Sequence, residues 1–182
     1  VPRTPQGARP LDIVVTGNVF HTYFDEKAAL YGSLCHLPDM NNLFIQSIIS
    51  HDKYYHLLGR SKISIAFNRR PGAFPSRSIE ALAVGAGVLA QQESVLGLWF
   101  GEAQGVHTYD STPVGLRQAV ERIFDDSDAF QKAALEGMKI ARAEFDPWRV
   151  ASQYLRMATF AATRPRGGRT LAPQPKQFRS VA

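Results

Sequence analysis

Residues 75–89 decide the fold and read Pro75-Ser-Arg-Ser-Ile-Glu-Ala-Leu-Ala-Val-Gly-Ala-Gly-Val-Leu89. The stretch predicts a short helix over Ser76–Val84, with Ser76 as its N-cap and Gly85 at its end. An apolar run, Lys62-Ile-Ser-Ile-Ala-Phe67, comes before it across a polar loop and predicts a strand, and a second strand is predicted after the helix. Strand, loop, helix and strand in this order form the unit of a parallel sheet.

The start of this helix carries polar side chains at a position where parallel sheets bind ligands. In open α/β sheets, ligands bind at the carboxyl ends of the strands, beside helix N-termini. Ser76, Arg77 and Glu80 occupy that position here. The free N–H groups and positive dipole end of a helix suit a phosphate. The carboxylate of Glu80, about one turn into the helix, can accept hydrogen bonds from a ribose diol.

Short strands and helices alternate along the rest of the chain. This alternation predicts an α/β fold with a doubly wound, mostly parallel, Rossmann-like sheet and helices on both faces. The run 43–49 fits a buried strand, although its apolar pattern also fits a helix. We expect strands at 11–16, 43–49, 63–67, 88–91 and 106–109, helices at 24–37, 52–58, 76–84, 112–124, 128–144 and 147–161, and a short helix or turn at 94–100.

Composition places the chain among ordinary globular proteins, with 45% hydrophobic and 20% charged residues. Its 182 residues fit one domain with a core of its own. No apolar run is long enough to span a bilayer. The single cysteine, Cys35, excludes an internal disulfide framework and suits a reducing compartment. We therefore expect a cytoplasmic location.

The two ends of the chain differ from its middle. Residues 1–10 are rich in Pro and Arg and predict a linker, residues 11–162 predict the domain, and residues 163–182 predict a disordered basic tail. That tail holds much of the excess behind the net charge of +5, and such a tail can contact acidic lipid at a membrane surface or nucleic acid. A solvated tail is the simpler alternative. No aromatic residues alternate with a dense basic run, so no nucleic-acid partner is expected. The basic residues of the tail are Arg164, Arg166, Arg169, Lys176 and Arg179.

Residues 75–89 also resemble the donor-binding site of GT-B glycosyltransferases of the group 1 type, and in particular the CgeB-like branch. The shared pattern is Arg77, then Glu80-Ala-Leu-Ala-Val-Gly85, then a short strand. The resemblance covers roughly residues 11 to 157, and the order and spacing of its segments carry it. The other matching segments are Asp12-Ile-Val-Val-Thr-Gly-Asn18, Tyr54–Ile63, Gly105–Asp110 and Arg142–Arg149.

The resemblance implies one half of a GT-B fold, the C-terminal half that holds a nucleoside-diphosphate sugar. The acceptor, whose identity stays open, would bind to an N-terminal GT-B domain. The chain begins at Val1 rather than Met and has room for one of the two Rossmann-like domains. We therefore expect a fragment of a hexosyltransferase-like glycosyltransferase that is not active alone. A non-catalytic Rossmann-like module that binds a nucleotide or a protein, and a fragment of a GT-B-type sugar-nucleotide epimerase, are the alternatives.

By the same resemblance, Glu80 binds the ribose hydroxyls of the donor. A structural alternative is an acid favoured near a helix N-terminus and paired with Arg77. Arg77 is suited to offset the charge of the diphosphate leaving group. Many retaining group 1 enzymes carry another Glu where this chain has Gly72. CgeB-like relatives often lack it too, so neither the catalytic residues nor the stereochemistry of transfer are assigned.

Three further residues are candidates for donor binding. Gly17 and Asn18 form the first strand-to-helix turn, and a glycine there lets a phosphate or sugar approach the backbone. A tight turn without a ligand is the alternative. Lys27 follows in the next helix, where group 1 enzymes often carry a phosphate-binding cation. The alternative for Lys27 is an ordinary lysine exposed to solvent on a helix.

No metal site is predicted. The five histidines do not have the spacing of metal ligands, such as two on one helix face beside a Glu. Helix dipole and arginine would offset the developing diphosphate charge, so we expect a metal-independent protein with no cofactor beyond its donor substrate. The histidines are His21, His36, His51, His56 and His107.

Overall fold

The computed structural model describes residues 9–17, 25–37, 40–45, 49–65, 67 and 76–163. Contacts divide the chain into two compact units, Val1–Asp146 and Pro147–Ala182. The sheet lies in the first unit, and helix α6 (Pro147–Thr163) lies in the second. The sequence placed α6 in the same domain as the sheet, so the contacts end the first unit earlier than residue 162. Residues 1–8 of the predicted linker and 164–182 of the predicted tail lie outside the described residues.

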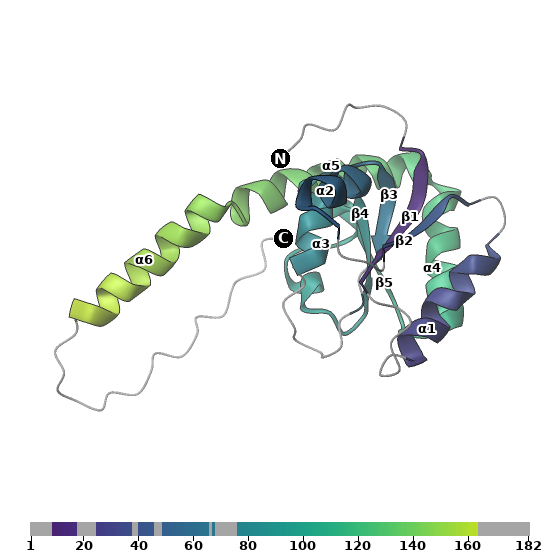
Figure 1. Cartoon of the computed structure of the whole chain (residues 1–182), viewed down its shortest axis with the longest axis horizontal. Coiled ribbons are helices and arrows are strands. Elements are labelled where there is room, and N and C mark those ends of the chain that lie inside the picture. The colour runs from purple at the N-terminus through teal and green to yellow at the C-terminus, as the bar shows by residue number, and fades with distance from the viewer. Residues whose placement is uncertain are drawn as a thin grey trace. The chain divides into compact units, whose positions relative to one another are not determined.

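Five parallel strands form the sheet, in the order β2-β1-β3-β4-β5 (Figure 1). The chain starts in β1, moves outward to β2, then crosses back to β3 and continues through β4 to β5. This reversal between β1 and β3 makes the sheet doubly wound and confirms the predicted fold class. The strands are β1 (Leu11–Thr16), β2 (Asn42–Ile45), β3 (Ser61–Ile65), β4 (Gly87–Gln91) and β5 (Val106–Tyr109).

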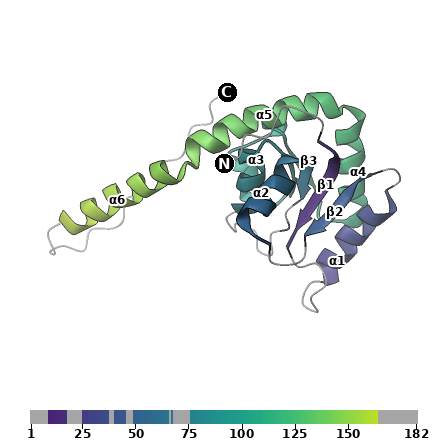
Figure 2. The same ribbon diagram turned by 45° about the horizontal axis from the view of Figure 1, so that its top comes forward.

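Helices cover both faces of the sheet (Figure 2). Side chains alternate along each strand, so the buried residues of β1 divide between two cores. Ile13 and Val15 belong to the core under α1 (Asp25–Gly32) and α4 (Pro113–Asp125). Val14 belongs to the core under α2 (His51–Gly59) and α3 (Ser76–Ala83). Because both faces are covered, both sets of alternating side chains in the middle of β1 are buried and apolar.

Helix α5 (Ser127–Glu144) contributes to both cores and contacts α3 and β4. Phe130 near its start packs in the core under α1 and α4, and Ala141 near its end packs in the other core. Gly87, the first residue of β4, lies against the Phe130 ring so closely that an added Cβ would overlap it. The packing of β4 against α5 therefore requires a glycine at position 87.

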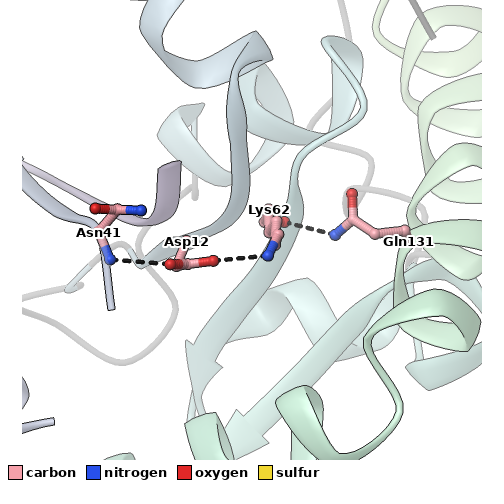
Figure 3. Close-up of polar contacts among 4 residues, drawn as sticks. All are labelled: Asp12, Asn41, Lys62 and Gln131. Carbon is pink, nitrogen blue, oxygen red and sulfur yellow. Dashed lines mark hydrogen bonds and ion pairs between the residues drawn. The ribbon is translucent and has the colours of Figure 1, made fainter. Parts of the chain in front are cut away.

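A polar network joins the amino ends of β1 and β3 (Figure 3). Lys62 Nζ lies 2.7 Å from Asp12 Oδ1, and the backbone N–H of Asn41 donates to Asp12 Oδ2 at 2.9 Å. Gln131 Nε2 of α5 donates to the Lys62 carbonyl at 3.2 Å. The network therefore connects β1, β3, the residue before β2, and α5. It lies at the amino ends of the strands, opposite to the edge where ligands are expected.

Two arginines fix the carboxyl end of α3. Arg142 Nε donates to the Ala83 carbonyl at 2.7 Å, and Arg9 donates to the Val84 carbonyl at 3.3 Å and to the Ser61 carbonyl at 2.7 Å. The Ala83 and Val84 carbonyls lie at the end of α3, where carbonyls lack a partner inside the helix, and cations are favoured at this negative dipole end. Gly85, with a φ of +80°, ends the helix as the sequence predicted. Arg9 belongs to the predicted linker, yet it contacts the first unit.

The element boundaries differ from the predicted ones in small ways. Helix α3 begins at Ser76 itself, so Ser76 is its first helical residue and not the N-cap before it. The helix expected at 24–37 is α1 followed by a tighter 3-10 turn, η1 (Ser33–His36). In the run 43–49, the strand β2 begins at Asn42 and ends at Ile45, residues 46–48 lie outside the described residues, and Ile49 is not part of a strand. The segment 94–100 contains the 3-10 turn η2 (Val95–Leu98), and η3 (Glu102–Gln104) precedes β5.

Candidate functional site

The candidate site lies where β1 and β3 end and α3 begins, at the point where the strand order reverses. Gly17 follows the last residue of β1, and its backbone N–H donates to the Ile45 carbonyl of β2 at 3.0 Å. Its φ is +98°, a left-handed conformation that favours glycine. Gly17 therefore leaves the backbone at the carboxyl edge of the sheet without a side chain of its own.

Two cations converge on Gly17 from different helices. Arg77 of α3 donates from Nη1 to the Thr16 carbonyl at 3.3 Å. A Cβ added to Gly17 would overlap Arg77 Nη1 and lie 3.2 Å from Lys27 Nζ of α1. Lys27 is 5% exposed, and its Nζ lies 5.5 Å from the centroid of the Tyr31 ring. Both side chains therefore bring positive charge to the same point of the sheet edge, which attracts an anionic ligand. The arrangement therefore favours a phosphate group above Gly17.

Glu80 lies about one turn after Arg77 on α3 and is half-buried. The Tyr54 hydroxyl of α2 donates to Glu80 Oε2 at 3.0 Å. Burial raises the pKa of Tyr54 well above its ordinary value, and the neighbouring Glu80 carboxylate raises it further against the opposing charge of Arg77. Tyr54 is therefore a neutral donor and Glu80 the acceptor. The Glu80 oxygens keep further lone pairs for hydroxyl groups of a ligand.

The structure brings together three of the residues predicted for the site, Gly17, Lys27 and Arg77, and places Glu80 on the same helix as Arg77. Lys27 is buried, so the alternative of a solvated lysine is wrong. Among the described residues, no ion pair joins Arg77 to Glu80. The alternative that the two residues serve as an ion pair on the surface of α3 is therefore not supported.

Of the remaining predicted residues, the structure describes Ser76 alone. Ser76 is exposed at the first position of α3. Asn18 and Gly72 lie outside the described residues.

Tyr54 is the residue of this site that sequence reasoning missed. It lies 26 residues before Glu80, on a different helix. No motif or spacing connects the two, because their contact depends on how α2 packs against α3. Only the helix packing reveals it.

Within the ranges given above, no group of three or more His, Cys, Asp or Glu side chains is arranged to hold a metal ion. Among the helices of the same ranges, none is long and apolar enough to cross a membrane.

Comparison with known proteins identifies a family. The model of a family described as glycosyl transferase-like matches residues 7–156. No curated protein matches the chain.

Solved structures share the fold. HepE from Anabaena in complex with UDP is 12% identical, with a TM-score of 0.67 over 84% of this chain and 50% of HepE. The same protein in complex with UDP-glucose is 14% identical, with a TM-score of 0.66 over 82% of this chain and 49% of HepE. Sucrose-phosphate synthase from Thermosynechococcus elongatus is 16% identical, with a TM-score of 0.61 over 86% of this chain and 47% of the synthase. The chain spans about half the length of these structures.

Proposed function

Since the chain belongs to the glycosyl transferase-like family, we propose that it is the donor-binding half of a GT-B glycosyltransferase. In this proposal the carboxyl edge of the sheet holds a nucleoside-diphosphate sugar. The observation that carries the proposal is the convergence of Arg77 and Lys27 on the bare backbone of Gly17.

The diphosphate is proposed to bind between Arg77 and Lys27. Transfer of a sugar leaves negative charge on the departing diphosphate, and fixed cations stabilise that charge as it develops. Arg77 is held in place by its bond to the Thr16 carbonyl, and Lys27 by burial. Neither side chain needs to reorganise when the charge appears. These two cations, together with the dipole of α3, support metal-independent binding of the diphosphate.

The ribose is proposed to bind at Glu80. Glu80 lies about one turn after Arg77 on α3, so one nucleoside diphosphate could contact Arg77 through its diphosphate and Glu80 through its ribose. Two vicinal hydroxyls can donate to one carboxylate, and charge-assisted bonds of this kind are among the stronger ones in proteins. HepE has been solved with UDP and UDP-glucose, which makes UDP the first nucleotide to test.

Several finer points are part of the same proposal. The acceptor would bind to an N-terminal GT-B domain, whose closure over the donor would exclude water. The transferred group would be a hexose, and the protein a CgeB-like member of the family. A cytoplasmic location is supported by the lack of a second cysteine for a disulfide. The basic residues 163–182 would hold the protein near acidic lipid.

A thermal-shift titration of the whole chain with UDP, GDP, ADP and dTDP tests the proposal. Ligand at about 100 times its Kd stabilises a fold by roughly 2.7 kcal/mol, so one nucleotide should raise the melting temperature clearly. Arg77→Met should raise the Kd for that nucleotide by roughly tenfold or more, since the substitution removes a charge-assisted contact.

Arg117→Met is the matched control. Arg117 is an exposed arginine of α4 whose Nε lies 3.2 Å from Glu121, and its loss should leave binding unchanged. A wild-type chain that responds to none of the four nucleotides, or an Arg77→Met chain that binds as tightly as wild type, would contradict the proposal.

A further inference from the structure

Tyr54 and Glu80 meet between α2 and α3, and their contact has a direction. The distance from Tyr54 Oη to Glu80 Oε2 is 3.0 Å. A carboxylate only accepts hydrogen bonds, so the phenol must donate here. We propose that Tyr54 is a positioning residue, which holds the Glu80 carboxylate ready for the ribose diol and thereby sets the preference for ribonucleotides. This inference rests on the proposed function.

The carboxylate of Glu80 needs such an anchor. The side chain is half-buried at the edge of the site, and an unrestrained glutamate populates several rotamers. Ordering it when a ligand arrives costs conformational entropy, which reduces affinity. A hydrogen bond already made to one oxygen restricts the side chain before the ligand binds.

The Tyr54 ring is itself held in place, which makes its hydroxyl a fixed point. The ring packs against the core under α2 and α3. It also contacts the ring of Tyr55 edge to face, with 5.4 Å between the centroids. An aromatic side chain has two side-chain torsions, so packing of the ring fixes the hydroxyl as well.

The charge state of the pair supports the same role. Burial raises the pKa of Tyr54, as does the charge of Glu80, so the phenol keeps its proton throughout the neutral range. Tyr54 therefore occupies one lone pair on Oε2. Oε1 and the second lone pair of Oε2 can still accept from hydroxyl groups of a ligand. Arg77, one turn away, is bonded to the Thr16 carbonyl, so loss of the phenol hydroxyl should leave the diphosphate contact intact.

Matched nucleotide pairs separate positioning from general damage to the site. Calorimetry measures Kd for UDP and 2′-deoxy-UDP, and for the corresponding guanine and adenine pairs, with the whole chain. Wild type should prefer the ribonucleotide by roughly tenfold, the value of one charge-assisted hydrogen bond. Tyr54→Phe keeps the ring and should reduce the preference to roughly threefold or less, with a smaller effect on the Kd of the deoxynucleotide, which donates to Glu80 only through its 3′-hydroxyl. Glu80→Gln should abolish most of the preference.

Tyr55→Phe is the matched control. Tyr55 is the next residue of α2 and is also near Glu80. Burial raises the pKa of Tyr55, and the charge of Glu80 raises it further. Among the described contacts, however, the Tyr55 hydroxyl makes no hydrogen bond to Glu80. This variant should keep the wild-type preference.

The outcomes distinguish this inference from the proposed function. If Tyr54→Phe keeps the wild-type preference, or weakens both members of a pair equally, Tyr54 does not position Glu80 and only this inference fails. If Glu80→Gln also keeps the preference, the ribose assignment of the proposed function fails too. If wild type binds no nucleoside diphosphate, both are overturned. A wild-type circular-dichroism spectrum confirms that each variant is folded.

Discussion

At Gly17, the side chains of Arg77 and Lys27 pack against the backbone in the space that a Cβ would occupy. The residue has a φ of +98°, and a Cβ would overlap the Arg77 guanidinium. Gly17→Ala should lower the free energy of unfolding by about 1–3 kcal/mol, because alanine in this conformation is strained and Arg77 must move. The same variant should weaken nucleotide binding. Urea denaturation and calorimetry measure the two effects.

Gly32→Ala is the control for that substitution. Gly32, the last residue of α1, has a φ of −58°, and a Cβ there meets nothing within 4 Å. Alanine should be neutral or should stabilise by up to about 1 kcal/mol. Equal behaviour of the two alanine variants would show that neither the conformation nor the contact at Gly17 matters.

Some residues of the candidate site could be predicted from the sequence, and others could not. Gly17, Arg77 and Glu80 could be predicted because each follows a strand or begins a helix at a known position of an α/β unit. The burial of Lys27 could not, because the helix pattern does not reveal that its ammonium group turns toward Gly17. Tyr54 was missed because its partner is 26 residues away and comes from another helix.

At the scale of elements, α3 is the helix on which the site depends, and its position is set from both ends. Arg77 attaches its first turn to β1, and Arg142 donates to the Ala83 carbonyl at its last turn. Arg142→Met should lower the free energy of unfolding by about 1 kcal/mol, through loss of a hydrogen bond and of a cation at the negative dipole end. Chemical denaturation measures it.

Lys139→Met provides the comparison, because Lys139 lies on α5 as Arg142 does. Lys139 Nζ lies 2.6 Å from Glu136 in an exposed pair, and such pairs contribute between 0 and about 1 kcal/mol. The Lys139 variant should therefore be the less destabilised of the two. The reverse order would show that the contact between Arg142 and Ala83 does not hold α3.

The elements themselves were largely predictable, because buried parallel strands are continuous apolar runs and the helices have clear ends. Gly85 and Pro147 mark such ends, and the structure agrees. The strand order could not be read from the sequence, since nothing local says that β3 returns beside β1. The position of α6 in a second unit was missed for a similar reason, as the helix pattern of 147–161 does not say what it packs against.

At the scale of the whole molecule, buried tyrosines make stability depend on alkaline pH. Burial raises the pKa of Tyr31, Tyr54 and Tyr109, and in each case a neighbouring group adds to the rise. A group whose folded pKa lies above its unfolded pKa stabilises the fold below the unfolded value, and this stability is lost as the pH rises toward the folded value. Unfolding should therefore become easier from about pH 10 upward, by up to about 1.4 kcal/mol per pH unit for each tyrosine.

Urea denaturation between pH 8 and pH 11 measures this loss, and Tyr54→Phe should make it shallower. Tyr154 of α6 is 68% exposed, so Tyr154→Phe should leave the pH dependence unchanged. A stability that is constant from pH 9 to pH 11 would contradict the burial of these phenols.

The central claim is that the carboxyl edge of this sheet binds a nucleoside diphosphate between Arg77 and Lys27. The most direct measurement is a calorimetric titration of the whole chain with UDP and UMP, repeated on Lys27→Met. Wild type should bind UDP more tightly than UMP by roughly tenfold, and Lys27→Met should remove most of this difference while the chain stays folded. Equal affinity of wild type for UDP and UMP, or a difference that survives in Lys27→Met, would contradict the central claim.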